Sequence, residues 1–183
     1  LADILSTIDE QTAMDSETLK TRFWDMFIVD ALIGNWDRHN GNWGFLYNNA
    51  TDEVTLAPVF DCGSSLYPQA DEDLMKKILS DKNELNHRIF DIPLSAVTYN
   101  GKKINYFKFL SEGEFPDCNK ALKRIASRID MKKIYEIIDN TPTITELQKE
   151  FYKTMLTARK ERIIDFSLNK LKEKSRKHDD MQR

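Results

Sequence analysis

The sequence is poor in residues that interrupt regular structure, and poor in cysteine. It has only 6 glycines and 5 prolines among 183 residues, well below the roughly 7% and 5% usual in proteins, so we expect long elements, most of them helices. The two cysteines, Cys62 and Cys118, are too few for a disulfide framework and are typical of a reducing compartment such as the cytoplasm.

Membrane and nucleic-acid signals are also lacking. No apolar run approaches the roughly 20 residues that span a bilayer, and the first five residues lack the basic start of a signal peptide. Lysine and arginine number 27 against 30 aspartates and glutamates, a net charge of −3, which argues against a DNA-wrapping protein or a polybasic membrane binder. We therefore expect a cytoplasmic protein with no membrane contact and no direct nucleic-acid partner.

Apolar residues make up 40% of the chain, enough for the core of one domain. The clearest helix begins near Ser16 or Thr18, either of which can cap it, and ends at Gly34-Asn35. Its apolar face is formed by residues at helical spacing: Leu19, Phe23, Met26, Phe27 and Ala31.

Further helices are predicted over 71–90, with an interruption near 81–83, from an Asp117 cap onward, and over 131–138. A long helix or helix pair is expected from Thr143, with Glu146 completing a capping box, to about residue 174. Its apolar face would carry Leu147, Phe151, Met155, Ile163, Phe166 and Leu171. Short hairpins are predicted for 42–47 with 54–57, and for 96–99 with 103–106 around Asn100-Gly101. The fold class is mainly helical α+β, a helical bundle with short β-hairpins, with a frayed tail at 175–183.

A polar loop between the first long helix and the first hairpin departs from ordinary core and surface patterns. Asp37 and Asn42 lie in this loop, and Asp61 follows the hairpin, which returns the chain toward the other two. Mg²⁺ takes carboxylate and amide oxygens in phosphoryl-transfer sites, and a separate carboxylate must orient and deprotonate the attacking hydroxyl. The spacing alone is a weak signal of such a site.

The full motif is more specific. Residues 32–45 read LIGNWDRHNGNWGF and residues 56–61 read LAPVFD; together they closely resemble the HipA-like serine/threonine kinases, bacterial enzymes named for the toxin of a toxin–antitoxin pair. The core from Asp37 to Asn42 is also similar to the catalytic loop of phosphoinositide lipid kinases. The close match covers residues 28–68, and the resemblance implies a protein-kinase-like C-terminal lobe across residues 1–183.

The resemblance also implies a reaction and a role for each site residue. Asp37 would be the catalytic base, and Asn42 and Asp61 would ligate Mg²⁺ and contact the phosphates of ATP. His39 would either hold the loop or touch the nucleotide. The function implied is transfer of the ATP γ-phosphoryl group to a serine or threonine of a protein substrate, with an antitoxin-like DNA-binding protein as a candidate partner.

The sequence departs from the pattern of two-lobed kinases. It has no G-x-G-x-x-G or G-x4-G-K string, and the 36 residues before Asp37 leave no room for an ATP-covering N-terminal lobe. Either the chain is the C-terminal half of a longer protein, which its start at Leu1 favours, or it has lost ATP chemistry. A small-molecule or lipid kinase, a non-catalytic binding lobe and half of a split kinase remain alternatives.

A few other side chains allow expectations of their own. Residues 62–64 read Cys-Gly-Ser where protein kinases have Phe-Gly, and Cys62 is expected to be half-buried packing without a basic neighbour. Trp36 and Trp43 are expected to pack the loop. Arg159 and Arg162 either reach the site, bind a phosphorylated residue or lie on a helix surface, possibilities that the sequence does not separate.

Overall fold

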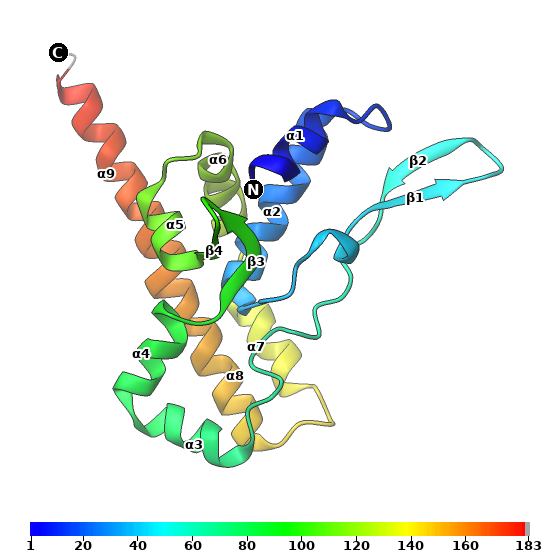
Figure 1. Cartoon of the computed structure of the whole chain (residues 1–183). Coiled ribbons are helices and arrows are strands. Elements are labelled where there is room, and N and C mark those ends of the chain that lie inside the picture. Colours follow the sequence, from blue (N-terminus) through cyan, green and yellow to red (C-terminus); the bar gives the residue numbers. More distant parts are fainter. Residues whose placement is uncertain (182–183) are drawn as a thin grey trace.

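The computed structural model describes residues 1–181; residues 182 and 183 lie outside the described part of the chain. It confirms a mainly helical α+β fold (Figure 1). The α-helices are α1 (Ala2–Glu10), α2 (Ser16–Ile33), α3 (Glu72–Ser80), α4 (Lys82–Phe90), α5 (Tyr106–Glu112), α6 (Pro116–Ala126), α7 (Met131–Asp139), α8 (Glu146–Arg159) and α9 (Phe166–Met181). A 3₁₀ turn, η1 (Asn40–Asn42), precedes the first hairpin, and a π-helical segment, η2 (Lys160–Asp165), joins α8 to α9.

Helix α2 is the centre of the core. Side chains on nearly all its faces are buried, which marks a helix enclosed by neighbours rather than one lying on the surface; these are Leu19, Phe23, Trp24, Met26, Phe27, Ile28, Ala31 and Leu32. Each large apolar side chain buried in this way contributes about 1.5–3 kcal/mol. The apolar face predicted for this helix is confirmed.

The start of α2 differs from the prediction by one residue. Asp15 is the cap: its carboxylate accepts hydrogen bonds from the backbone N–H and the hydroxyl of Thr18, each at 2.8 Å. Ser16 and Thr18 are already helical, and a cap residue must lie outside the helix to present its side chain to the free N–H groups. Gly34 ends the helix with a φ of 67°, as expected.

Two other predicted caps are also displaced. The capping box of α8 is Thr145 with Gln148, although Thr143 and Glu146 satisfy the same spacing, so the pattern alone could not choose between them. Helix α6 begins at Pro116 rather than after an Asp117 cap, because proline is well suited to the first helical position. The interruption of 71–90 is confirmed, since Asp81 separates α3 from α4.

The strands form two separate antiparallel hairpins, β1 (Phe45–Asn48) with β2 (Glu53–Leu56) and β3 (Leu94–Tyr99) with β4 (Lys102–Asn105). The second turns at Asn100-Gly101, whose φ angles of 50° and 73° are both positive, as a type I′ turn requires. The first projects away from the helices (Figure 1). It carries the chain from η1 out to solvent and back to the segment that ends at Asp61.

The C-terminal helices α8, η2 and α9 form one continuous helical segment, as predicted, but the π-helical stretch changes which residues face inward. Because a π turn is wider than an α turn, it shifts the pattern that follows. Ile163, Ile164 and Ser167 are fully buried, whereas Phe166, which was predicted to lie on the apolar face, is 47% exposed. Fraying was expected over 175–183; α9 continues as helix to Met181, and residues 182 and 183 of that tail lie outside the described residues.

Among the described residues, no helix is both long and apolar enough to cross a membrane.

Gly113 offers a test of the packing between α5 and α9. It ends α5 with a φ of 63°, and a Cβ placed there would lie 2.6 Å from Cδ2 of Leu171, which is buried. We expect Gly113→Ala to lower the free energy of unfolding by at least about 1 kcal/mol, because the backbone is left-handed and the methyl group overlaps a core side chain.

Thermal or urea unfolding monitored by circular dichroism measures this change. Gly63→Ala is the matched control, since a Cβ at Gly63 meets nothing within 4 Å and its φ is not in the left-handed region. Equal stability of the two variants would contradict the described packing.

Candidate active site

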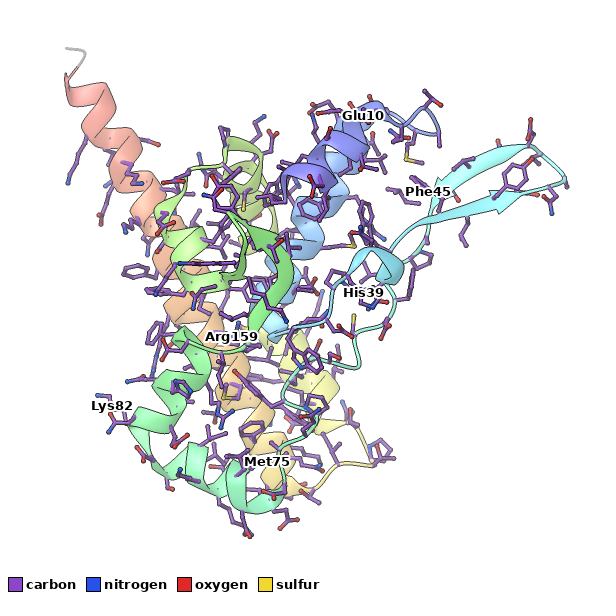
Figure 2. The ribbon with its side chains drawn as sticks, in the orientation of Figure 1. Glu10, His39, Phe45, Met75, Lys82 and Arg159 are labelled. Atoms are coloured by element: carbon purple, nitrogen blue, oxygen red, sulfur yellow. The ribbon has the colours of Figure 1, made fainter. Side chains whose placement is uncertain are left out.

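The three oxygen-bearing residues singled out from the sequence lie on two segments that flank the first hairpin. Asp37 and Asn42 belong to the loop that runs from the end of α2 through η1, and Asp61 follows β2. Asn42 is buried, Asp37 is half-buried and Asp61 is exposed, with a φ of 53°. In Figure 2 this loop is marked by His39 and the start of the hairpin by Phe45.

A buried carboxylate, Asp30 in the last turn of α2, anchors the loop. Its Oδ1 accepts hydrogen bonds from Nδ2 of Asn35 at 2.9 Å and Nη2 of Arg38 at 3.2 Å, and its Oδ2 accepts one from Nε of Arg38 at 3.0 Å. Burial raises the pKa of Asp30, and the hydrogen bonds from Arg38 and Asn35 oppose that rise. The ion pair with Arg38 is almost fully enclosed, with side chains 3% and 5% exposed.

Asn35 connects the buried carboxylate of Asp30 to the backbone of Asp37 through hydrogen bonds. Its Oδ1 accepts a hydrogen bond from the N–H of Asp37 at 3.1 Å, while its own carbonyl accepts one from the hydroxyl of Tyr106 at 2.6 Å. Asn35 is fully buried and Tyr106 is 2% exposed. The backbone at Asp37 is therefore held from inside the core.

Arg38 contacts both site segments. Its Nη1 donates to the carbonyl of Asn42 at 2.8 Å and to the carbonyl of Phe60 at 2.6 Å, and its Nη2 lies 3.3 Å from Sγ of Cys62. Cys62 is exposed and has this basic neighbour. The expectation of a half-buried cysteine without one was wrong, because Arg38 is distant in sequence and reaches it only through the fold.

The side-chain oxygens of the three site residues are left available. Nδ2 of Asn42 donates a hydrogen bond to the carbonyl of Asp37 at 2.8 Å, so the side-chain oxygen of Asn42 takes no part in that bond. Within residues 1–181, no hydrogen bond reaches this oxygen or the carboxylates of Asp37 and Asp61, and no three His, Cys, Asp or Glu side chains gather into a closed metal site. Carboxylate and amide oxygens without a protein partner are the type of ligand that Mg²⁺ takes, together with water and substrate phosphates.

His39 holds the loop in shape. Its Nδ1 accepts a hydrogen bond from the N–H of Gly41 at 3.0 Å, which caps η1. Its own N–H donates to the carbonyl of Asp37 at 2.8 Å, and its carbonyl accepts from the N–H of Asn42 at 3.0 Å. Of the two roles left open for His39, these contacts support the first; contact with a nucleotide stays a prediction.

Arg159 neither reaches the site nor lies on the surface. It is 1% exposed and donates from Nε to the carbonyl of Ala31 at 2.9 Å and from Nη1 to the carbonyl of Arg88 at 3.2 Å. It therefore joins the ends of α2 and α4 (Figure 2). Trp43 is half-buried and packs against Phe23, as expected, but Trp36 is 38% exposed.

An apolar cavity of about 390 Å³ lies beside the loop, between α1 and the start of β1. Ile4 and Ile8 of α1 face Trp43 and Phe45 across it, and Asn40, two residues before Asn42, lies at its edge. The cavity is therefore lined by residues on both sides of Asn42 in the chain.

The residues that support the site from the core were not predicted: Asp30, Asn35 and Arg38 in its structural role. One signal was present, since Asp30 lies directly between apolar positions of the α2 pattern. A carboxylate on the buried side of a helix needs a cationic or hydrogen-bonding partner, and the loop that follows offers Asn35 and Arg38, the first cationic residue after Asp30.

This helical lobe, with its catalytic-type loop, hairpin and following aspartate, has the fold of a kinase-like C-terminal lobe. The chain belongs to the HipA-like C-terminal domain family, whose model matches residues 1–146. Over 179 residues it is 51% identical to the serine/threonine-protein kinase CtkA of Helicobacter pylori strain J99, a match covering 97% of this chain and 55% of that protein.

A solved structure agrees with this assignment. The fold matches the crystal structure of a Helicobacter pylori proinflammatory kinase CtkA with a TM-score of 0.93 and 52% identity, covering 96% of this chain and 64% of that one. The chain therefore spans little more than half the length of the curated relative that it matches.

Asp30 provides a test of the anchor. We expect Asp30→Ala to lower the free energy of unfolding by roughly 3–5 kcal/mol, because it leaves the guanidinium of Arg38 buried without its counter-ion. Denaturant unfolding of the purified variant measures this loss.

Asp25→Ala is the control on the same helix. Asp25 pairs with Arg124, and both side chains are partly exposed, so we expect a loss of about 1 kcal/mol or less. An Asp30→Ala variant no less stable than Asp25→Ala would show that the buried pair does not support the loop.

Proposed function

We propose that this chain is the catalytic C-terminal lobe of a protein kinase that transfers the γ-phosphoryl group of ATP to a serine or threonine hydroxyl, with Mg²⁺. One observation carries the proposal: three unengaged oxygen donors, on Asp37, Asn42 and Asp61, stand on two segments that a single guanidinium ties together. The 51% identity to the serine/threonine-protein kinase CtkA supports it.

Each site residue has a role that its surroundings suit. Asp37 is half-buried and its carboxylate has no partner among the described residues, so it can orient an acceptor hydroxyl and take its proton. Asn42 and Asp61 would hold Mg²⁺, which neutralises charge on the phosphates during transfer. The hydrogen bonds that fix the Asp37 backbone hold the base in place before substrate arrives, and such positioning lowers the barrier.

The apolar cavity between α1 and β1 is the proposed site of the nucleotide base. Its volume of about 390 Å³ falls in the usual range of small-molecule sites. The side chains of Ile4 and Ile8 and the ring of Trp43 offer apolar contacts, and the carboxylate of Asp3, which also lines the cavity, can accept hydrogen bonds from ribose hydroxyls. Asn40 and Trp43 also line the cavity, so a base bound there would lie beside the loop that carries Asn42.

Other parts of the proposal are supported by the chain's membership of the family and not by contacts in the structure. A phosphate-covering segment and a phosphate-binding lysine would come from outside these residues, so we expect the isolated chain to be inactive. An antitoxin-like DNA-binding partner is a hypothesis that the HipA resemblance alone supports. A cytoplasmic location is proposed because both cysteines are unpaired thiols.

Two substitutions in the full-length protein separate the proposed roles. We expect Asp37→Asn to bind Mg·ATP as the parent does while phosphoryl transfer falls by about 10²–10⁴-fold, because only the base is lost. Asp61→Ala should lose Mg²⁺-dependent nucleotide binding. Titration calorimetry measures binding, and radiolabel transfer to protein, lipid and sugar acceptors measures activity.

Asp73→Asn, on the exposed first turn of α3, is the control and should match the parent in both assays. Parent-like turnover by Asp61→Ala would refute the metal role. Transfer to lipid or sugar but not to protein would refute the substrate class.

Gly44 tests the location of the base. It lines the cavity, its φ is not left-handed, and a Cβ there meets nothing within 4 Å. We expect Gly44→Leu to fold normally but to weaken nucleotide binding at least about 10-fold, because its side chain occupies the cavity. Thr55→Leu, an exposed position on the same hairpin, is the control; equal nucleotide affinities of the two variants would exclude this cavity.

A further inference from the structure

Arg38 has more partners than an ordinary ion pair needs. The guanidinium carries five N–H groups, and each has a partner: Nε and one N–H of Nη2 go to Asp30, both N–H groups of Nη1 go to backbone carbonyls, and the other N–H of Nη2 points to Cys62. Because the group is planar and rigid, these partners cannot shift independently of one another.

The two carbonyl partners are those that matter for the site. One belongs to Asn42 itself and the other to Phe60, the residue before Asp61. At 2.8 Å and 2.6 Å both are short hydrogen bonds from a cationic donor, a class about twice as strong as neutral ones. A single nitrogen atom thus bridges the backbones that carry the two proposed metal ligands.

The covalent path between those ligands is a weak constraint by comparison. It runs through the β1–β2 hairpin, which projects from the body (Figure 1), and an isolated two-stranded hairpin is only marginally stable in water. All four residues of β1 are exposed. The guanidinium, in contrast, is enclosed and held by a buried carboxylate on α2.

We propose that Arg38 is a positioning residue that sets the separation of Asn42 and Asp61 and thereby the affinity of the site for Mg²⁺, an inference that rests on the proposed function. Mg²⁺ demands nearly octahedral ligands at 2.0–2.1 Å, so a small change in ligand separation weakens binding. Residues that orient metal ligands typically alter metal affinity by 10–100-fold when they are substituted.

Arg38→Lys in the full-length protein tests this. Lysine keeps the positive charge beside Asp30 but has one nitrogen, so it cannot serve Asp30 and both carbonyls in the same geometry. We expect the Mg²⁺ concentration for half-maximal binding of a non-hydrolysable ATP analogue, measured by calorimetry, to rise about 10–100-fold. Binding of the analogue in EDTA should remain unchanged, because the cavity is intact.

Arg124→Lys is the matched control. Arg124 also forms a two-pronged pair with an aspartate of α2, Asp25, but neither residue lies in the site, so its Mg²⁺ dependence should equal that of the parent. A folded Arg38→Lys variant with parent-like Mg²⁺ dependence would overturn the inference and leave the proposed function standing. Absence of Mg²⁺-dependent binding in the parent would overturn both.

A measurement on the parent protein covers the case in which Arg38→Lys does not fold. The Nε–H of Arg38 is buried and bonded to Asp30, so its NMR signal should be observable. We expect this signal to shift when Mg²⁺ is added with the ATP analogue, and to stay in place with the analogue in EDTA. If the chemical shift of the Nε–H of Arg38 does not change when Mg²⁺ is added, the inference is overturned.

Discussion

The buried ion pair between Asp30 and Arg38 is the constraint on which the site depends. Removing two charges from water is costly, and such a pair is often no more stabilising than apolar residues of the same size. Here every N–H of the guanidinium has a partner, which limits the penalty. The main effect of the pair is therefore on the geometry of the site and not on the free energy of unfolding. It fixes the position of the loop that carries Asp37 relative to the segment that carries Asp61.

The rest of the lobe keeps this anchor rigid. Asp30 lies on α2, which is enclosed on nearly all sides. The end of α2 is held by Arg159, a fully buried cation whose pKa is lowered by burial and which has no carboxylate partner among the described residues. Its partners are carbonyls at the ends of α2 and α4, where the helix dipoles are negative. These carbonyls engage Nε and Nη1, whereas Nη2 of Arg159 has no hydrogen-bond partner among the described residues, so its guanidinium is less fully bonded than that of Arg38.

Predictions that relied on local chemistry were confirmed where one solution was available. Asn100-Gly101 formed the expected turn because few other residues tolerate two positive φ angles. Where two neighbouring solutions satisfied the same rule, as with Thr143 and Thr145, the choice was wrong. The prediction that Phe166 lies on the buried face was wrong for another reason. It assumed 3.6 residues per turn throughout, and the π-helical stretch before Phe166 has a wider turn.

The sequence by itself determined the helical class, the hairpins and the motif that contains Asp37, Asn42 and Asp61, because propensity, turn chemistry and motif spacing act over a few neighbouring residues. Only the tertiary structure decided that Arg38 joins the two halves of the motif, that Cys62 has a basic neighbour, and that Arg159 supports the core. These depend on contacts between residues 22, 24 and 128 positions apart. Such contacts form only when the apolar core has packed, and no local pattern encodes them.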